Sequence, residues 1–305
     1  MKRAIITGST GLLGLSVARY FSACGIDVLC LGRQRFDKES SHQYFGDHAT
    51  YLQLEMEEIL SLRNQLLNLD WPVGDDCVFF HFAWGGDQKL TDGGFAVQLN
   101  NAIYAANAVR AAKIIGCIKF VNAGTLEETY AENYLKGKTS EVYQSAQTDY
   151  ALSKLASRDL CKMVAYMEKI DYVHTRLSAP VAPDLSQGSY VAETLKRIAK
   201  KQSYSLPTST KLFDIISTDD VSQAYQMIGE NGKNKADYFI GTSCPATLAD
   251  YFGYFAKQKN SLDHCALITR SSGEMSLFST EALSRDTGFV PGTTFEGLIQ
   301  KLKTL

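Results

Sequence analysis

The sequence predicts an α/β fold in which helices cover both faces of a doubly wound parallel sheet. Short β-branched and aromatic runs alternate with amphipathic stretches along most of the chain. A glycine-rich turn follows the first of these runs at once, as it does where a strand leads into a helix. With 305 residues and a 45% apolar fraction, the chain is long enough for one large globular α/β unit.

The expected strands are short, apolar and spaced by helix-length segments. They lie at residues 4–7, 28–31, 51–54, 78–82, 120–123, 172–177, 213–216 and 238–240. The expected helices lie at residues 12–24, 57–69, 95–115 and 149–167, with a closing helix at 295–302. Residues 130–147 form a polar, tyrosine-containing segment before the helix at 149–167, and we expect this segment to be a loop that borders a functional site.

The first expected strand ends in three glycines spaced three apart, Gly8, Gly11 and Gly14. Gly8 permits the tight turn, Gly11 allows a pyrophosphate to approach the backbone, and Gly14 lets the following helix pack closely. The exposed N–H groups and the helix dipole then favour an anion. The turn predicts dinucleotide contacts from Gly8, Ser9, Thr10, Gly11, Leu12, Leu13 and Gly14. The alternative is a strand–helix turn that binds no nucleotide.

Tyr150 and Lys154 lie four residues apart on an expected helix, so that their side chains share a face. An ammonium beside the Tyr150 hydroxyl would lower the phenol pKa, because a nearby cation favours the phenolate. A tyrosine in that setting can exchange a proton with a sugar or alcohol oxygen. The alternative is an ordinary surface tyrosine and lysine, and the glycine turn favours the catalytic interpretation.

With both motifs, the chain resembles the extended branch of the short-chain dehydrogenase/reductase superfamily, the NAD(P)-dependent epimerase/dehydratase family that acts on nucleotide sugars. The resemblance covers nearly the whole chain. It also rests on the fourth strand ending in His81-x-Ala83, on Asn101 in the next helix, on the fifth strand ending at Thr125, and on the Asp-Val helix start at residues 219–221.

The resemblance implies a Rossmann-like dinucleotide-binding domain over residues 1–177 plus 213–242 and a smaller, discontinuous substrate lobe over 178–212 plus 243–305. It also implies a homodimer through the helices 95–115 and 149–167. Small residues on the first helix permit close packing between subunits, although they suit burial against the sheet equally well: Ala102, Ala105, Ala106, Ala108, Ala111 and Ala112.

The resemblance assigns catalysis to Thr125, Tyr150 and Lys154. Tyr150 is the acid/base, Thr125 hydrogen-bonds the same substrate oxygen, and Lys154 lowers the Tyr150 pKa and binds the nicotinamide ribose. For Thr125 the alternative is an ordinary turn residue after a strand. Besides the glycine turn, it implies cofactor contacts from Arg33, Glu55, Phe82, Ala83, Asn101, Tyr150 and Lys154. His81 and His174 lie in expected strands, where core or cofactor-adjacent roles are favoured over general bases.

Arg33 follows the second strand at the place where an acid would bind the ribose hydroxyls of NAD. Because an arginine there accommodates the 2′-phosphate, the sequence favours NADP, with NAD as the alternative.

The favoured reaction is reduction of a keto group, with C4 preferred, on a nucleoside-diphosphate-linked sugar. A 4-epimerase or 4,6-dehydratase with retained NAD(P) is the alternative, since Glu127 matches the dehydratase glutamate although Leu126 replaces the first acid. Retention of the catalytic set argues against a further alternative, a non-catalytic NADP-binding redox sensor. Substrate contacts are expected from Trp84, Thr125, Leu126 and Glu127, and candidate diphosphate ligands are Lys196, Arg197, Lys211 and Arg270.

Composition narrows the remaining classes. The formal charge, 31 − 33 = −2, gives no electrostatic case for nucleic acid or an anionic membrane. No apolar run has membrane-spanning length and no signal-peptide pattern is present, so a cytoplasmic protein is expected. The seven dispersed cysteines lack metal-ligand spacing, and we expect them to be reduced, with neither a structural disulfide nor a metal site.

Overall fold

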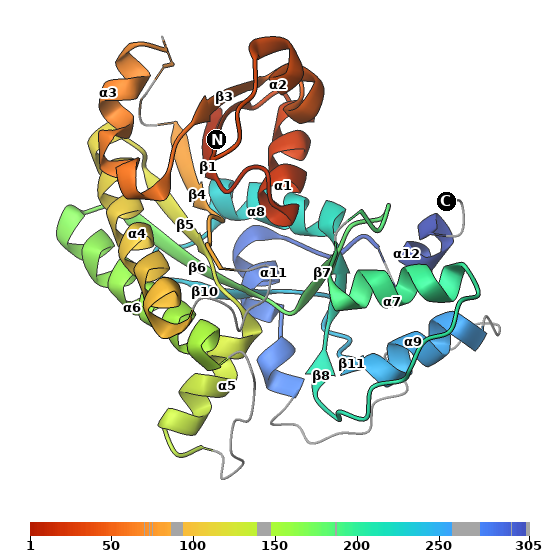
Figure 1. Ribbon diagram of the computed structural model, residues 1–305. Coiled ribbons are helices and arrows are strands. Elements are labelled where there is room, and N and C mark those ends of the chain that lie inside the picture. The colour runs from red at the N-terminus through yellow and green to blue at the C-terminus, as the bar shows by residue number, and fades with distance from the viewer. Residues whose placement is uncertain are drawn as a thin grey trace.

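The computed structural model describes residues 1–69, 71–72, 74, 76–86, 94–138, 148–186, 188–257, 275–293 and 295–302. At its centre is a seven-stranded sheet in the order β10-β6-β5-β4-β1-β2-β3, with every neighbouring pair parallel (Figure 1). The strands are β1 Arg3–Thr7, β2 Asp27–Gly32, β3 Ala49–Gln53, β4 Cys77–His81, β5 Lys119–Ala123, β6 Asp171–Leu177 and β10 Asp237–Ile240. The order runs outward from β1 in both directions, so the predicted doubly wound, Rossmann-like α/β fold is confirmed.

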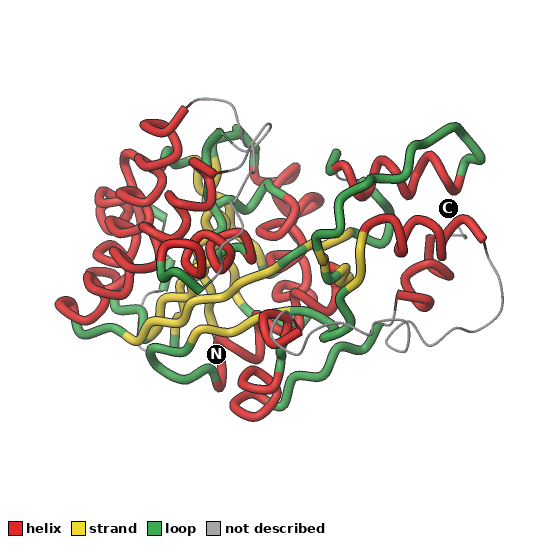
Figure 2. Tube along the Cα trace, turned by 90° about the horizontal axis from the view of Figure 1, so that it is seen from below, coloured by secondary structure: helices red, strands yellow, loops and turns green. Residues whose placement is uncertain are grey.

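Helices cover both faces of this sheet (Figure 2). One face is covered by α1 Leu12–Ala23 and α8 Thr218–Asn231, with α2 Lys38–Phe45 against α1 and α11 Glu281–Thr287 against α8. The other face is covered by α4 Gly94–Ile115 and α6 Thr148–Glu168, with the 3-10 helix η1 Met56–Ser61 and α3 Leu62–Leu67 beside α4. The single helix predicted at 57–69 is therefore a 3-10 segment followed by a short α-helix.

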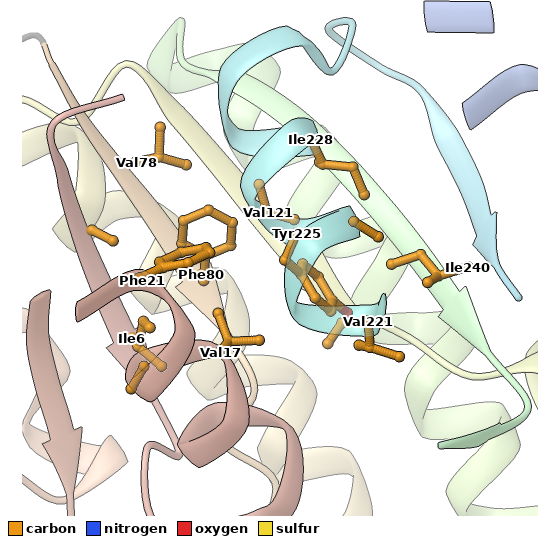
Figure 3. Close-up of a cluster of buried hydrophobic side chains, with 14 of the residues drawn as sticks. Ile6, Val17, Phe21, Val78, Phe80, Val121, Val221, Tyr225, Ile228 and Ile240 are labelled. Atoms are coloured by element: carbon orange, nitrogen blue, oxygen red, sulfur yellow. The ribbon is translucent and has the colours of Figure 1, made fainter. Parts of the chain in front are cut away.

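Two apolar cores lie on the two faces of the sheet because successive side chains of a strand point to opposite sides. Figure 3 shows the first core, in which Ile6 and Phe80 meet Phe21 of α1 and Tyr225 of α8. In the second core, Ile5 and its neighbours pack against α4 and α6. The small α4 residues Ala105, Ala106, Ala108, Ala111 and Ala112 all belong to this second core, so they pack within the chain.

Segments far apart in the sequence form a smaller region beside the sheet (Figures 1 and 2). It contains β7 Ala179–Val181, α7 Tyr190–Ala199, β8 Leu212–Phe213, β9 Ile215–Ser217, β11 Ala246–Thr247, α9 Leu248–Lys257 and α12 Phe295–Leu302. β7 pairs with β9 in parallel, and β11 pairs with β8 in antiparallel fashion. Val181, Leu195, Phe252 and Leu298 share one apolar cluster here, which joins four separate stretches of chain.

The strand predicted at 213–216 is interrupted at Asp214, which lies between β8 and β9. Its buried carboxylate accepts hydrogen bonds from the backbone N–H groups of Thr242 and Ser243, each at 2.9 Å. The interruption therefore ties the strand to the segment that follows β10.

The segment after Thr125 also differs from expectation, because α5 Leu126–Leu135 occupies part of the predicted polar loop. A capping box starts this helix: the Thr125 hydroxyl accepts a backbone N–H of the first turn, and the Glu128 carboxylate accepts the backbone N–H of Thr125. Residues 139–147 of the predicted loop lie outside the described residues.

Cys244 corrects the expectation of reduced cysteines, because it is disulfide-bonded. The five other described cysteines are free, and Cys265 lies outside the described residues. Across the described ranges, no helix has both the length and the apolarity to cross a membrane. Among the described residues, no three His, Cys, Asp or Glu side chains lie close enough together to hold a metal ion.

Candidate active site

The glycine turn brings β1, α1 and the end of β4 into close contact. Gly8 has φ +66, and a Cβ there would lie 2.7 Å from the backbone nitrogen of Ala83. A Cβ on Gly14 would overlap the carbonyl of Gly8, whereas at Gly11 the nearest atom would be 3.4 Å away. Gly8 and Gly14 are therefore required for packing, and Gly11 leaves the backbone open to a ligand.

A cavity of about 580 Å³ opens above this turn. Of the residues predicted from sequence to bind cofactor or substrate, its lining contains Gly8, Thr10, Gly11, Arg33, Glu55, Phe82, Ala83, Trp84 and Asn101. The other predicted residues do not line it: Ser9, Leu12, Leu13, Gly14, Thr125, Leu126, Glu127, Tyr150 and Lys154. The Ser9 hydroxyl is buried and donates to the Leu31 carbonyl at 3.0 Å. The open backbone, the helix N-terminus and the cavity together fit a bound dinucleotide.

The cavity has further lining residues that the sequence reasoning missed. Tyr104 and Glu57 line it and are joined by a hydrogen bond of 2.9 Å, and Asn100, Met56 and Val97 lie nearby in the lining. Val97, Asn101 and Tyr104 follow one another at helical spacing, so the pattern on α4 contained a signal for this face.

The loop after β2 is held in place by its backbone. The carbonyl of Arg33 accepts from the Gln53 amide at 3.1 Å, and the carbonyl of Gln34 accepts from the Tyr51 hydroxyl at 2.7 Å. The Arg33 side chain is exposed at the cavity, so a guanidinium and not a carboxylate stands at the end of β2.

Helix α4 fixes the turn after β4. Asn101 accepts from the backbone N–H of Gly85 at 2.7 Å and donates to its carbonyl at 3.0 Å. Gln98 accepts from the indole N–H of Trp84 at 2.7 Å and donates to the carbonyl of Gly86 at 3.0 Å. The amide of Asn101 is thus engaged by the turn that it borders.

His81 is a buried, neutral histidine that joins β1 to β4. The Thr7 hydroxyl oxygen accepts from the N–H groups of Phe82 and Ala83, and its hydrogen is donated to His81 Nδ1 at 2.9 Å. Burial, reinforced by the Lys154 charge, lowers the pKa of His81 to about 3. His81 is therefore uncharged at neutral pH.

Lys154 meets the end of β5 and two aromatic rings. Its ammonium donates to the carbonyl of Ala123 at 2.9 Å and lies 3.9 Å from the centre of the Trp84 ring. The Tyr150 ring centre is 5.8 Å from the same ammonium, and Trp84 and Tyr150 make an edge-on contact with centroids 5.9 Å apart. The predicted tyrosine–lysine pair thus shares one site with Trp84. The Ala123 carbonyl that binds Lys154 belongs to the last residue of β5, two residues before Thr125.

Thr125 is the N-cap of α5 and has an extended backbone, with φ −143 and ψ 154. Its hydroxyl oxygen accepts from the backbone N–H of Glu127 at 3.4 Å. This bond uses an oxygen lone pair and leaves the hydroxyl hydrogen to be donated to another acceptor.

Leu126 and Glu127 have different surroundings. Leu126 is 2% exposed and packs in an apolar cluster with Leu212 and Phe278. The Glu127 carboxylate forms an ion pair with Lys211, whose ammonium also lies 5.0 Å from the centre of the Tyr130 ring. Glu127 and Lys211 thereby connect α5 with the segment that enters β8.

Comparison with known proteins gives a consistent result. The model of the NAD-dependent epimerase/dehydratase family matches residues 4–241. Among curated proteins, CDP-abequose synthase of Salmonella typhimurium is 23% identical over 255 residues, which are 82% of this chain and 78% of that protein.

Solved structures with similar folds include UDP-glucose 4-epimerase of Thermotoga maritima with UDP-glucose. It has a TM-score of 0.69 and 16% identity, and the match covers 99% of this chain and 97% of that chain. WbmF of Bordetella bronchiseptica in complex with NAD+ and UDP has a TM-score of 0.69 and 15% identity, with 99% and 91% covered. At these identities the likeness establishes the fold alone.

Proposed function

The chain belongs to the NAD-dependent epimerase/dehydratase family of nucleotide-sugar enzymes, and we propose that it reduces a C4 keto group of a nucleoside-diphosphate-linked sugar with NADPH. One observation carries this proposal. Trp84 lines the dinucleotide cavity and also contacts Tyr150 and Lys154. Trp84 thus links the cavity to a proton donor, which supports a redox cofactor and a carbonyl group meeting at this border of the cavity.

The residues of the cavity suit NADP. The glycine turn and the α1 N-terminus would hold the pyrophosphate, Ala83 and Phe82 would border the nicotinamide half, and the Arg33 guanidinium would hold the 2′-phosphate. When bound, the nicotinamide supplies the hydride for reduction.

The chain's own residues handle the proton. Tyr150 donates its hydroxyl hydrogen to the substrate oxygen as the carbonyl becomes an alcohol. Lys154 stabilises the phenolate that remains, because its ammonium is held near the Tyr150 ring by Ala123 and Trp84. Thr125 donates a hydrogen bond to the same oxygen and fixes its direction.

Glu127 favours reduction over dehydration. A dehydratase needs a carboxylate that removes a proton from the sugar, and here the Glu127 carboxylate is engaged by the Lys211 ammonium. Lys211 comes from the region proposed to bind the sugar nucleotide, which supports it as a diphosphate ligand.

The proposal is tested by adding NADPH and purified protein to a panel of nucleoside-diphosphate 4-keto-6-deoxyhexoses. We expect stoichiometric loss of the reduced-nicotinamide absorbance with one member, and CDP-linked sugars are the first choice given the similarity to CDP-abequose synthase.

Three results would contradict the proposal. A sugar that changes configuration without net NADPH loss would identify an epimerase. Loss of water from a nucleoside-diphosphate sugar with a 6-hydroxyl, added as a further member of the panel, would identify a dehydratase. NADPH binding with no turnover of any sugar would support a redox sensor.

A further inference from the structure

Glu128 is a buried acid directly behind Thr125. Its exposed fraction is 0%, and both of its carboxylate oxygens are engaged. Oε1 accepts from the backbone N–H of Thr125 at 2.5 Å, and Oε2 lies 2.9 Å from Nε2 of His174. A carboxylate this deeply buried is tolerated only when it is paired and hydrogen-bonded, and these two contacts meet that condition.

His174 continues the hydrogen-bond network into the sheet. It lies on β6, is 1% exposed, and its Nδ1 is 3.4 Å from the amide nitrogen of Asn122 and 3.2 Å from the Tyr172 hydroxyl. The Asn122 amide is a donor, so Nδ1 accepts and the ring hydrogen stands on Nε2, where it is donated to Glu128. Asn122 lies on β5, and the network thus returns to the strand that leads to Thr125.

Gly124 leaves room for the Glu128 carboxylate and the His174 imidazole. A Cβ at Gly124 would overlap both the Glu128 carboxylate and the His174 ring. The acid and the imidazole therefore pack directly on the backbone just before Thr125, and the acid also accepts the Thr125 N–H.

Glu128 also lies near Lys154, because the Lys154 ammonium donates to the carbonyl of Ala123, the residue next to the Gly124 on which Glu128 packs. The charged and titratable groups around it are His174 from β6, with Tyr172 behind that ring, and Lys154 from α6. Burial alone would raise the pKa of Glu128, but His174, the Thr125 N–H and Lys154 outweigh burial and hold the pKa below its usual value. Its negative charge opposes the effect of the Lys154 ammonium on Tyr150.

We propose that Glu128 and His174 are positioning residues, which fix Thr125 at the end of β5 and set how strongly Lys154 acts on Tyr150. Both residues are fully buried, so they act through their neighbours. The inference rests on the proposed function, because that function gives Thr125, Tyr150 and Lys154 their roles.

The first experiment needs no substrate. Protein labelled with 13C at tyrosine Cζ is titrated by NMR, and Tyr150→Phe assigns the Tyr150 resonance. Glu128→Gln removes the charge but keeps an oxygen for the Thr125 N–H, so we expect the Tyr150 pKa to fall by about 0.5 unit or more. The matched control is Glu132→Gln, one helical turn along α5 and ion-paired with Arg158, which should leave the Tyr150 pKa unchanged.

The second experiment measures ketone reduction against pH. Tyr150 must be protonated to act as a donor, so the high-pH limb of kcat in Glu128→Gln should move to lower pH by the same shift. Glu128→Ala removes both hydrogen bonds and should lower kcat by about tenfold or more, with KM for NADPH unchanged.

The proposal would be overturned by a Glu128→Gln variant whose Tyr150 pKa and whose pH profile of kcat are the same as in the wild type. The proposed ketone reduction and the positioning role of Glu128 and His174 can fail separately. If the wild type reduces no ketone but Glu128→Gln still lowers the Tyr150 pKa, the proposed reaction is refuted and the positioning role of Glu128 and His174 is supported.

Discussion

At the scale of single residues, the Tyr150 hydroxyl is the group on which the proposed chemistry depends. Tyr150→Phe keeps the ring that contacts Trp84 and removes only the proton donor. We expect turnover to fall by about 10²- to 10⁴-fold, the usual contribution of a general acid, while NADPH binding stays within about twofold. Tyr166→Phe is the matched control, because Tyr166 lies on the same helix and is 70% exposed. Equal turnover of the two variants would remove Tyr150 from the mechanism.

Arg33 carries the prediction of cofactor preference. Arg33→Ala removes the guanidinium proposed to hold the 2′-phosphate, and a charge-assisted hydrogen bond of this kind is worth about 1.5–3 kcal/mol. We therefore expect KM for NADPH to rise by about tenfold or more, with KM for NADH nearly unchanged. The comparison is with Arg35→Ala, an exposed arginine two residues later. If KM for NADPH stays the same in Arg33→Ala, the preference for NADP has another origin.

At this scale the sequence was informative wherever the signal is local. The spacing of Gly8, Gly11 and Gly14 and of Tyr150 and Lys154 follows from turn and helix geometry within a few residues. The partners of these residues were not predictable in the same way. Trp84 reaches Lys154, and Glu128 reaches His174, only after strands distant in sequence have been placed side by side.

At the scale of elements, one ion pair holds α5 against α6. Glu132 accepts two hydrogen bonds from Arg158, at 2.9 and 3.1 Å, and the two side chains are 21% and 15% exposed. The hydrogen bonds from Arg158, helped by Lys136, outweigh burial and lower the pKa of Glu132 from 4.5 to about 2. A carboxylate with a lowered pKa stabilises the folded state above its unfolded pKa, and this contribution is lost as pH falls towards 2.

Glu132→Gln should therefore destabilise the protein by about 1–2 kcal/mol at pH 7, allowing for screening of a partly exposed pair. The difference in melting temperature from wild type should shrink steadily as the pH is lowered from about 5 towards 2. Glu193→Gln is the control, because Glu193 pairs with Lys196 on an exposed surface and should change little at any pH. A Glu132 variant whose deficit is the same at pH 7 and pH 3 would contradict this account.

Two differences from the expected elements arise from side-chain hydrogen bonds and not from apolar periodicity. α5 begins where Thr125 and Glu128 build a capping box, and its polar composition resembles a loop. The strand near residue 214 is broken because one buried carboxylate binds a distant segment. The long helices were predictable because their apolar residues recur at helical spacing, and the central strands because they are short apolar runs buried on both faces.

At the scale of the whole molecule, we propose the division into residues 1–177 plus 213–242 and residues 178–212 plus 243–305. The proposal is supported by the separate apolar cluster around Phe252 and Leu298. Two segments cross this division, since Leu283 and Phe289 pack in the first core of the sheet and Ile215 packs in the smaller cluster. Asp220 of α8 accepts from the backbone N–H groups of Gly292 and Thr293, at 3.1 and 3.0 Å, and so joins the C-terminal segment to the sheet domain.

The outer surface of α4 and α6 supports the expected homodimer. The small alanines of α4 are used inside the chain, and the apolar residues that remain exposed on this pair of helices include Ile103, Ile114, Leu160, Met163, Tyr166 and Met167. We expect Met163→Glu to convert a dimer to a monomer in sedimentation experiments, because an uncompensated charge would be buried in the interface. Leu135→Glu makes a similar apolar-to-acid change on α5 at a 64% exposed site and should leave the dimer intact. A monomeric wild type would contradict the expectation.

The strand order has a consequence for synthesis on the ribosome. β6 ends at Leu177, yet its outer neighbour β10 begins only at Asp237. At about 5–20 residues per second, several seconds pass before the second strand is made. During that time β6 presents an unpaired strand edge, which is a template for pairing with another nascent chain. Elongation speed and chaperone supply between these two strands should therefore govern how much of the protein is recovered in native form.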